Sequence, residues 1–159
     1  MAGTHRIIEG GRSAKGLRIV IVAARFNHFV VDKLLAGAVE ALTQAGISAQ
    51  DLDIVRVPGA FELPLAARKL AASKNYEAVI TLGAVIRGGT PHFDFVAGEC
   101  AHGVAQAARD SGVPVIFGVL TCDTLEQATE RAGGAHGNKG ADSALAAIEM
   151  ADLMRKLDS

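Results

Sequence analysis

The sequence lacks an excess of charge of either sign and has few aromatic residues. Its 16 Lys and Arg oppose 17 Asp and Glu, which leaves a formal net charge of −1. A chain so close to neutral has no overall electrostatic attraction to nucleic acid or to an anionic membrane surface. Neither partner is expected, and any anionic ligand must be bound by a local group of charges.

Cysteine and long apolar runs are also scarce. Cys100 and Cys122 form neither a Cys-x-x-Cys pair nor part of a metal-binding cluster. Residues 1–16 mix charges with glycines and lack the apolar stretch of a secretory signal. No later run approaches the roughly 20 apolar residues that a membrane span needs. We therefore expect a cytoplasmic protein with reduced thiols.

No internal repeat, low-complexity tract or Pro/Ser-rich linker divides the chain. With 159 residues, half of them apolar, it can bury one sizeable core but is short for two. The sequence therefore predicts a single domain over residues 1–159.

Apolar runs alternate with segments of helical spacing, which predicts an α/β fold with a parallel sheet and helices on its faces. The first helical segment carries an apolar stripe and stops at Gly46, and the last carries a stripe through Ala146, Met150, Leu153 and Leu157. Residues 7–9 could add a strand that pairs with the sheet edge of a neighbouring subunit. The four predicted strands are Ile19–Ala24, Ile54–Val57, Ala78–Leu82 and Val113–Val119.

Ligands of open parallel sheets bind beyond the carboxyl ends of the strands, so the segments at those ends are the candidate site. These segments are Arg25–His28, Pro58–Glu62, Gly83–Asp94 and Phe117–Thr121.

The third segment suggests a phosphate site. Gly88 and Gly89 allow close backbone approach, and Thr90 followed by Pro91 predicts a helix N-terminus whose free N–H groups suit an anion. His92 could move the proton that phosphate release requires. The alternatives are an ordinary capped helix and a histidine that only hydrogen-bonds a loop.

The other segments offer an aromatic face, a carboxylate and cations. Phe26 could stack on a planar heterocycle or close the core, and Glu62 could bind hydroxyls or only favour a helix N-terminus. Arg131 and Lys139 flank a glycine-rich break that either holds phosphate or is a solvated helical hairpin. Glu99 and His102 have the spacing of some metal ligands, but a solvated or intersubunit helix face explains them better.

Taken together, Arg25–Asn27, Pro58–Glu62, Gly83–Asp94, Phe117–Thr121 and Gln127–Gly140 closely resemble the lumazine synthase family over essentially the whole chain. The resemblance implies a flavodoxin-like three-layer α/β/α sandwich with a four-stranded parallel sheet. It also implies condensation of 5-amino-6-(D-ribitylamino)uracil with 3,4-dihydroxy-2-butanone 4-phosphate to 6,7-dimethyl-8-ribityllumazine, phosphate and water, the penultimate step of riboflavin biosynthesis. Such a transferase needs no cofactor and no metal.

The resemblance also assigns roles to residues. Phe26 stacks on the pyrimidine, Ala60 and Glu62 hold the ribityl chain, and His92 moves protons. Phosphate is bound by Gly89, Thr90 and Arg131. The remaining substrate-binding residues are Asn27, Gly59, Phe61, Ala84, Val85, Ile86, Phe117 and Lys139.

Members of this family have their active sites between subunits of a pentamer, and some close pentamers into an icosahedral shell that associates with riboflavin synthase. The resemblance therefore implies a homo-oligomer of this kind. Ala135 stands where shell-forming members often carry Lys. Two rival functions are a shell or ligand-binding protein without catalysis, and a flavodoxin-like mononucleotide carrier.

Overall fold

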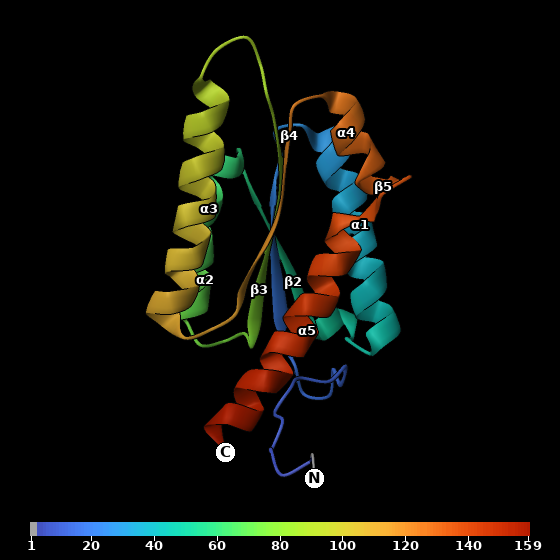
Figure 1. Cartoon of the computed structure of the whole chain (residues 1–159), viewed down its shortest axis with the longest axis vertical. Coiled ribbons are helices and arrows are strands. Elements are labelled where there is room, and N and C mark those ends of the chain that lie inside the picture. Colours follow the sequence, from blue (N-terminus) through green and yellow to red (C-terminus); the bar gives the residue numbers. More distant parts are fainter. Residues whose placement is uncertain (1–2) are drawn as a thin grey trace.

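A computed structural model describes residues 3–159, and a four-stranded parallel sheet of order β2-β1-β3-β4 lies at its centre (Figure 1). Helices α1, α4 and α5 lie on one side of the sheet and α2 and α3 on the other. This arrangement confirms the expected three-layer flavodoxin-like sandwich. The strands are β1 (Ile19–Ala24), β2 (Leu52–Val57), β3 (Ala78–Ile86) and β4 (Val115–Cys122). The helices are α1 (His28–Ala45), α2 (Leu63–Ala72), α3 (His92–Ser111), α4 (Leu125–Glu130) and α5 (Lys139–Asp158), with 3-10 turns at Ala49–Asp51 and Ala60–Glu62.

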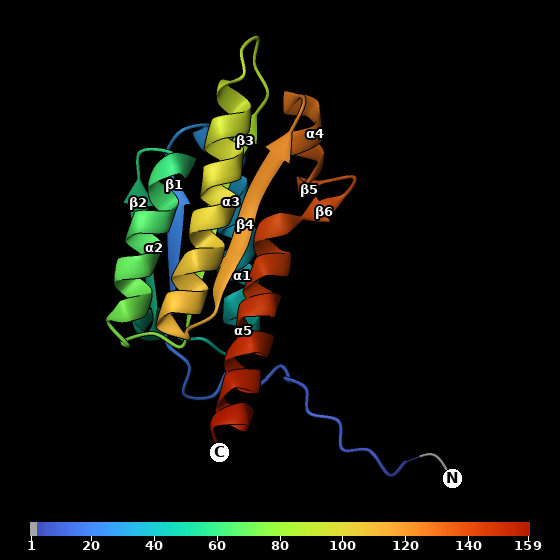
Figure 2. The ribbon, with the colours of Figure 1, turned by 60° about the vertical axis from the view of Figure 1, so that its left-hand side comes forward.

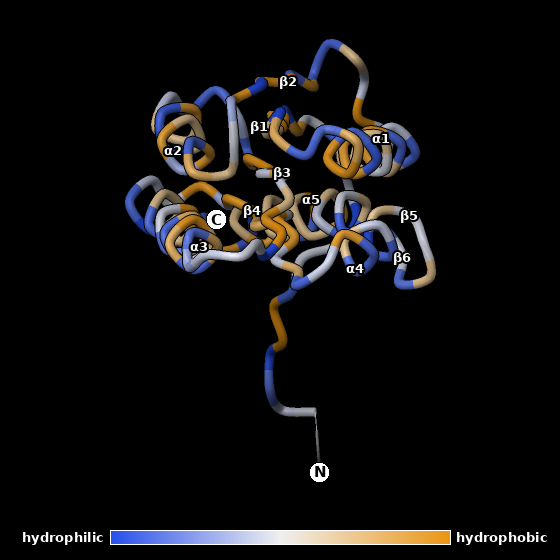
Figure 3. Tube along the Cα trace, turned by 90° about the horizontal axis from the view of Figure 1, so that it is seen from above, coloured by the Kyte–Doolittle hydropathy of each residue, from blue (hydrophilic) through white to orange (hydrophobic). Residues whose placement is uncertain are grey.

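Successive side chains of the buried strands point to opposite faces of the sheet, so a separate hydrophobic core forms on each face. Ile19 and Ile21 of β1 pack with the helices α1 and α5, whereas Val20 and Val22 pack with α2 and α3. A strand covered on both faces has to be apolar at every position, and every residue of β1 is buried. Viewed from above, the sheet lies between the two layers of helices (Figure 3).

The third and fourth strands extend further than the sequence predicted. β3 continues beyond Leu82 to Ile86, and β4 runs on to Cys122, because the two strands remain paired up to Ile86 and Cys122. Ala84, Val85 and Ile86 are therefore strand residues. Phe117 lies inside β4, as it does in the predicted strand Val113–Val119.

The first and last helices lie against each other on one face of the sheet. α1 ends at Gly46, whose φ of 107° is the left-handed cap that the sequence predicted. The predicted apolar stripe of α5 was wrong, since Leu157 is 55% exposed. A Cβ at Gly140 would overlap the carbonyl oxygen of Leu34, so the helices approach too closely for large side chains. The face of α5 that is buried consists mainly of small residues: Gly140, Ser143, Ala144, Ala147, Ile148 and Ala151.

The N-terminal segment crosses the C-terminal half of α5 and then runs away from it toward the N-terminus (Figure 2). Its anchors are hydrogen bonds from the Gly11 N–H to Asp152 Oδ2 at 2.7 Å and from Lys156 Nζ to the Glu9 carbonyl at 2.9 Å. Residues 7–9 form no strand in the single chain, and Ile7 is 80% exposed. Their pairing with a neighbouring subunit stays a prediction. Within residues 3–159, no helix has the length and apolarity needed to cross a membrane.

Candidate active site

A cavity of about 700 Å³ opens at the carboxyl ends of β1, β2 and β3. Every predicted site residue from these three strand ends lines it except Gly89, whose neighbours Gly88 and Thr90 do. The segments that end these three strands therefore meet at one cavity, as expected, whereas Phe117–Thr121 does not line it, and the role of the cavity as the substrate site stays a prediction. The lining residues are Phe26, Asn27, Pro58, Gly59, Ala60, Phe61, Glu62, Ala84, Val85, Ile86, Gly88, Thr90, His92, Phe93, Phe95 and Val96.

The end of β1 presents an aromatic ring on a fixed backbone. Asn27 has a φ of 60°, a left-handed conformation that asparagine tolerates, and its side-chain amide donates to the Ala84 carbonyl at 2.8 Å. The Phe26 N–H donates to the Pro58 carbonyl at 2.9 Å. Phe26 is 71% exposed, which excludes the alternative that it closes the core. Its ring is free to stack on a ligand, whereas the amide nitrogen of Asn27 serves the fold.

The turn after β2 places a carboxylate close to that ring. Residues 60–62 form a short 3-10 turn, and Glu62 occupies the N-cap position of α2. A Cβ at Gly59 would lie 3.3 Å from Glu62 Oε1 and 3.8 Å from the Cβ of Phe26. Gly59 thus leaves free the space between the Glu62 carboxylate and the Cβ of Phe26.

The loop from β3 to α3 is open and carries two of the three predicted phosphate ligands, Gly89 and Thr90. An added Cβ at Gly88 or Gly89 would meet no atom within 4 Å, and neither residue has a positive φ. The fold itself therefore does not require glycine at these positions, whereas close approach of a ligand would.

The helix that follows this loop begins one residue later than predicted. Pro91 occupies the N-cap position of α3 with a ψ of 3°, and no side chain caps the helix. The expectation that Thr90 is the cap was wrong, because the turn at Pro91 moves the helix start to His92. Thr90 and His92 are both exposed at the cavity.

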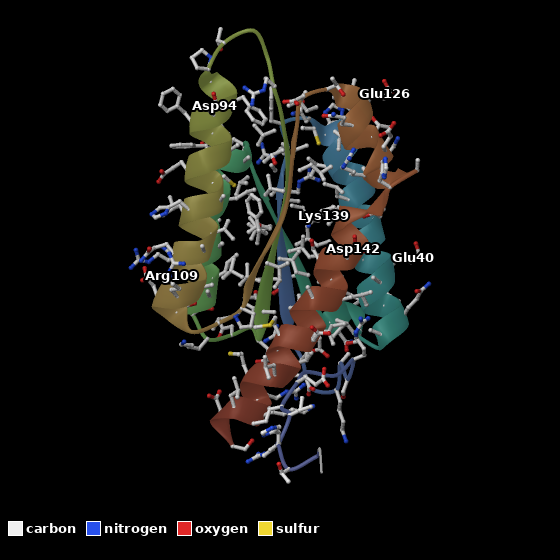
Figure 4. All side chains as sticks on the ribbon, in the orientation of Figure 1. Glu40, Asp94, Arg109, Glu126, Lys139 and Asp142 are labelled. Carbon is white, nitrogen blue, oxygen red and sulfur yellow. The ribbon has the colours of Figure 1, made fainter. Side chains whose placement is uncertain are left out.

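Phe117, Arg131 and Lys139 do not reach this cavity. They line a second one of about 530 Å³, and none of residues 3–159 lines both. In Figure 4, Lys139 at the start of α5 lies across the sheet from Asp94 in the first turn of α3. One chain therefore separates the predicted residues into two groups. The second cavity is lined by Phe117, Val119, Leu120, Thr121, Cys122, Gln127, Arg131, His136, Lys139 and Asp142.

Arg131 and Lys139 are joined by a small β-hairpin, made of β5 (Ala132–Gly134) and β6 (Gly137–Asn138), which replaces the helical hairpin considered from the sequence. The Lys139 N–H donates to the Arg131 carbonyl at 2.9 Å, which holds the two cations near each other. Arg131 Nη1 donates to the Gln127 carbonyl at 3.0 Å and lies 3.7 Å from the Glu130 carboxylate. Burial raises the pKa of the Cys122 thiol, which favours the neutral form over a nucleophilic thiolate.

Several lining residues were given no individual role from the sequence, although Phe93, Gln127 and His136 lie within segments named there. Phe93, Phe95 and Val96 belong to the first turns of α3, and Phe95 is 71% exposed. Their position directly after His92 was the available signal. Gln127, His136 and Asp142 of the second cavity gave no signal that separates them from ordinary surface residues.

A flavodoxin-like sandwich with a largely apolar cavity and a few polar groups at its strand ends defines an α/β protein that binds small molecules at that edge of the sheet. Residues 16–155 match the family described as 6,7-dimethyl-8-ribityllumazine synthase. A relative of that name from Syntrophus aciditrophicus is 56% identical over 151 residues, covering 95% of this chain and 98% of its own length. Another from Desulfotalea psychrophila is 58% identical over 150 residues, covering 94% and 97%. The chain belongs to the 6,7-dimethyl-8-ribityllumazine synthase family, whose members are transferases of riboflavin biosynthesis.

Proposed function

We propose that this chain condenses 5-amino-6-(D-ribitylamino)uracil with 3,4-dihydroxy-2-butanone 4-phosphate to give 6,7-dimethyl-8-ribityllumazine. The amine attacks the ketone and loses water to form a Schiff base, phosphate is eliminated, and ring closure releases water again. The observation that carries this proposal is the convergence of an exposed aromatic ring, a carboxylate, an open glycine loop and a histidine on one cavity.

The pyrimidine would stack on Phe26, a contact worth roughly 1–3 kcal/mol if base stacking is the guide. Val85 and Ile86 end β3 at the cavity, where their backbone groups can bond the edge of the ring. Glu62 accepts hydrogen bonds from ribityl hydroxyls and lies beside Ala60. The apolar part of the cavity thus receives the planar heterocycle and the polar turn receives its chain.

The phosphorylated ketone would bind at the β3–α3 loop. Gly89 and Thr90 present backbone and hydroxyl donors next to the N-terminus of α3, whose dipole favours an anion. Arg131 adds a planar guanidinium that can hold two phosphate oxygens. His92, the first residue of α3, moves protons during phosphate release, a contribution of typically 10²–10⁴-fold.

Arg131, Lys139 and Phe117 would come from a neighbouring copy of the chain, since no residue in the described part of the chain lines both cavities. An interface between two different surfaces of the same chain closes into a ring when the rotation permits. We propose a pentameric ring with one active site at each interface. Assembly of pentamers into a shell and association with riboflavin synthase belong to the same proposal.

The test mixes purified protein with both substrates under conditions where the spontaneous reaction is slow, and follows lumazine absorbance. Acceleration over the protein-free control is expected. Arg131→Ala should lose most of it at low ketone concentration, whereas Arg68→Ala, which removes a guanidinium 65% exposed at its side chain, should retain it. No acceleration by a correctly assembled oligomer would overturn the proposal in favour of a ligand-binding or shell protein.

A further inference from the structure

Arg87, the first residue after β3, contacts two different elements through one guanidinium. Its Nε donates to Asp123 Oδ1 at 2.9 Å, just beyond the end of β4. Its Nη1 lies 3.4 Å from Asp94 Oδ1, and its Cζ lies 4.4 Å from the centre of the Phe93 ring. Figure 4 shows Asp94 at the end of α3 nearest the β3–α3 loop. The side chain therefore joins the end of β3 to the end of β4 and to the first turn of α3.

The loop that Arg87 spans has little packing of its own. Residues 88–91 are exposed, and added Cβ atoms at Gly88 and Gly89 would meet nothing within 4 Å. Position is therefore imposed on this loop from its two ends. Arg87 stands at one end, and its contacts with Phe93 and Asp94 lie at the other.

The same guanidinium is linked to the second cavity. The N–H of Asp123 donates to Gln127 Oε1 at 2.8 Å, and Gln127 forms a capping box with Thr124 at the start of α4. The Gln127 carbonyl accepts from Arg131 Nη1 at 3.0 Å. A continuous set of polar contacts thus runs from the first turn of α3 to the predicted phosphate-binding arginine.

We propose that Arg87 is a positioning residue for the proposed reaction: held between Asp94 and Asp123, it fixes the phosphate-binding loop and α4 relative to each other. This inference rests on the proposed function. The guanidinium acts through its two carboxylates and does not contact phosphate. In a ring of copies, each Arg87 therefore orders the loop of one active site and the Arg131 of the next.

Variants at Asp123 separate positioning from direct binding. Arg87→Gln should raise the KM for the ketone and the inhibition constant of inorganic phosphate roughly tenfold to a hundredfold, because small displacements of binding groups are costly. Arg87→Lys should recover part of the loss. Asp123→Asn should weaken phosphate binding in the same way, although it releases the Arg87 guanidinium from one of its carboxylate partners. A direct phosphate ligand would instead bind phosphate equally well or more tightly in Asp123→Asn, and that result would overturn the proposal.

A double variant tests whether the two residues act together. Arg87→Gln combined with Asp123→Asn should be no worse than Arg87→Gln alone, because the contact with Asp123 is already lost in that variant. Additive losses would mean that the residues act separately and would overturn the positioning role. Arg68→Gln, which removes a guanidinium 3.8 Å from Asp110 elsewhere on the surface, is the matched control and should leave both constants unchanged.

Hydrogen exchange adds a readout that does not depend on turnover. Peptides covering residues 87–95 should exchange faster in the oligomer of Arg87→Gln than in that of Arg68→Gln. If the wild type makes lumazine but these peptides exchange equally fast in the two variants, the positioning role of Arg87 is overturned and the proposed function stands. A wild type without turnover would overturn the proposed function, whatever the exchange rates are.

Discussion

Complementation between two impaired variants tests directly whether the active site is shared. His92 lines the first cavity and Arg131 the second. If each site combines the first cavity of one copy with the second cavity of its neighbour, His92→Ala and Arg131→Ala damage opposite halves. An interface in a mixed ring can then unite two intact halves, which neither variant achieves alone.

The size of the recovery follows from counting interfaces. In a random one-to-one mixture each interface has four equally frequent pairings, and one of them joins the intact first cavity of Arg131→Ala to the intact second cavity of His92→Ala. The mixture should therefore regain about a quarter of wild-type turnover, since every interface of a closed ring is heterologous. His92→Ala alone should retain roughly 1% or less, given a proton-transfer contribution of at least about 10²-fold.

The assay co-expresses the two variants with different tags, isolates mixed oligomers and follows lumazine formation at low ketone concentration. A mixture of Arg131→Ala with Lys139→Ala is the matched control, because both changes damage the second cavity and no interface is restored. Activity equal to the mean of the separate variants would show that each chain completes its own site, and the argument from two cavities would then be refuted.

Three further predictions concern stability and binding. Gly140→Ala should lower the free energy of unfolding in urea by about 1–3 kcal/mol, because the added Cβ overlaps the Leu34 carbonyl. Gly98→Ala should raise it by about 0.5–1 kcal/mol, because Gly98 lies within α3 and its Cβ would meet open space. Phe26→Ala should leave the unfolding free energy almost unchanged and raise the KM for the pyrimidine roughly 5- to 150-fold, the equivalent of a lost stacking contact; an unchanged KM would remove Phe26 from the site. A backbone hydrogen bond lowers the pKa of Asp152 below its usual 3.8, so this carboxylate stabilises the fold above pH 3.8 and loses that effect as the pH falls through the folded-state pKa. Asp152→Asn should therefore be less stable at neutral pH and approach wild type in strong acid, and a difference that persists at the lowest pH would contradict this.

The sequence predicted those parts of the fold whose pattern depends on the chain alone. β1 has the predicted bounds because a strand buried on both faces is a continuous apolar run. α1 ends at the predicted glycine because only the left-handed conformation closes the helix there. The buried face of α5 could not be predicted from its large apolar residues, since it depends on how closely α1 approaches Gly140. That distance is a property of the packed layers.

The site followed the same division. Residues that end three neighbouring parallel strands were expected to meet, and they line one cavity. Arg131 and Lys139 lie away from that cavity because the chain that follows β4 continues on the side of the sheet covered by α1. Local residue spacing does not encode which side the chain takes. The contacts of Arg87 were missed for a related reason, since its partner Asp123 follows a different strand.

The exposed phenylalanines show that binding and assembly make demands on the same surface. Phe26, Phe61 and Phe95 line the cavity and are 71%, 55% and 71% exposed. Full burial of such a ring contributes about 1.5–3 kcal/mol, and the isolated chain gains little of it. Removing a ring that only substrate covers leaves the stability of the oligomer unchanged. Removing a ring that a neighbouring chain covers lowers it. Oligomer size measured beside KM therefore separates these two roles for each ring, and a variant that changes both lies where the substrate and the neighbouring copy meet.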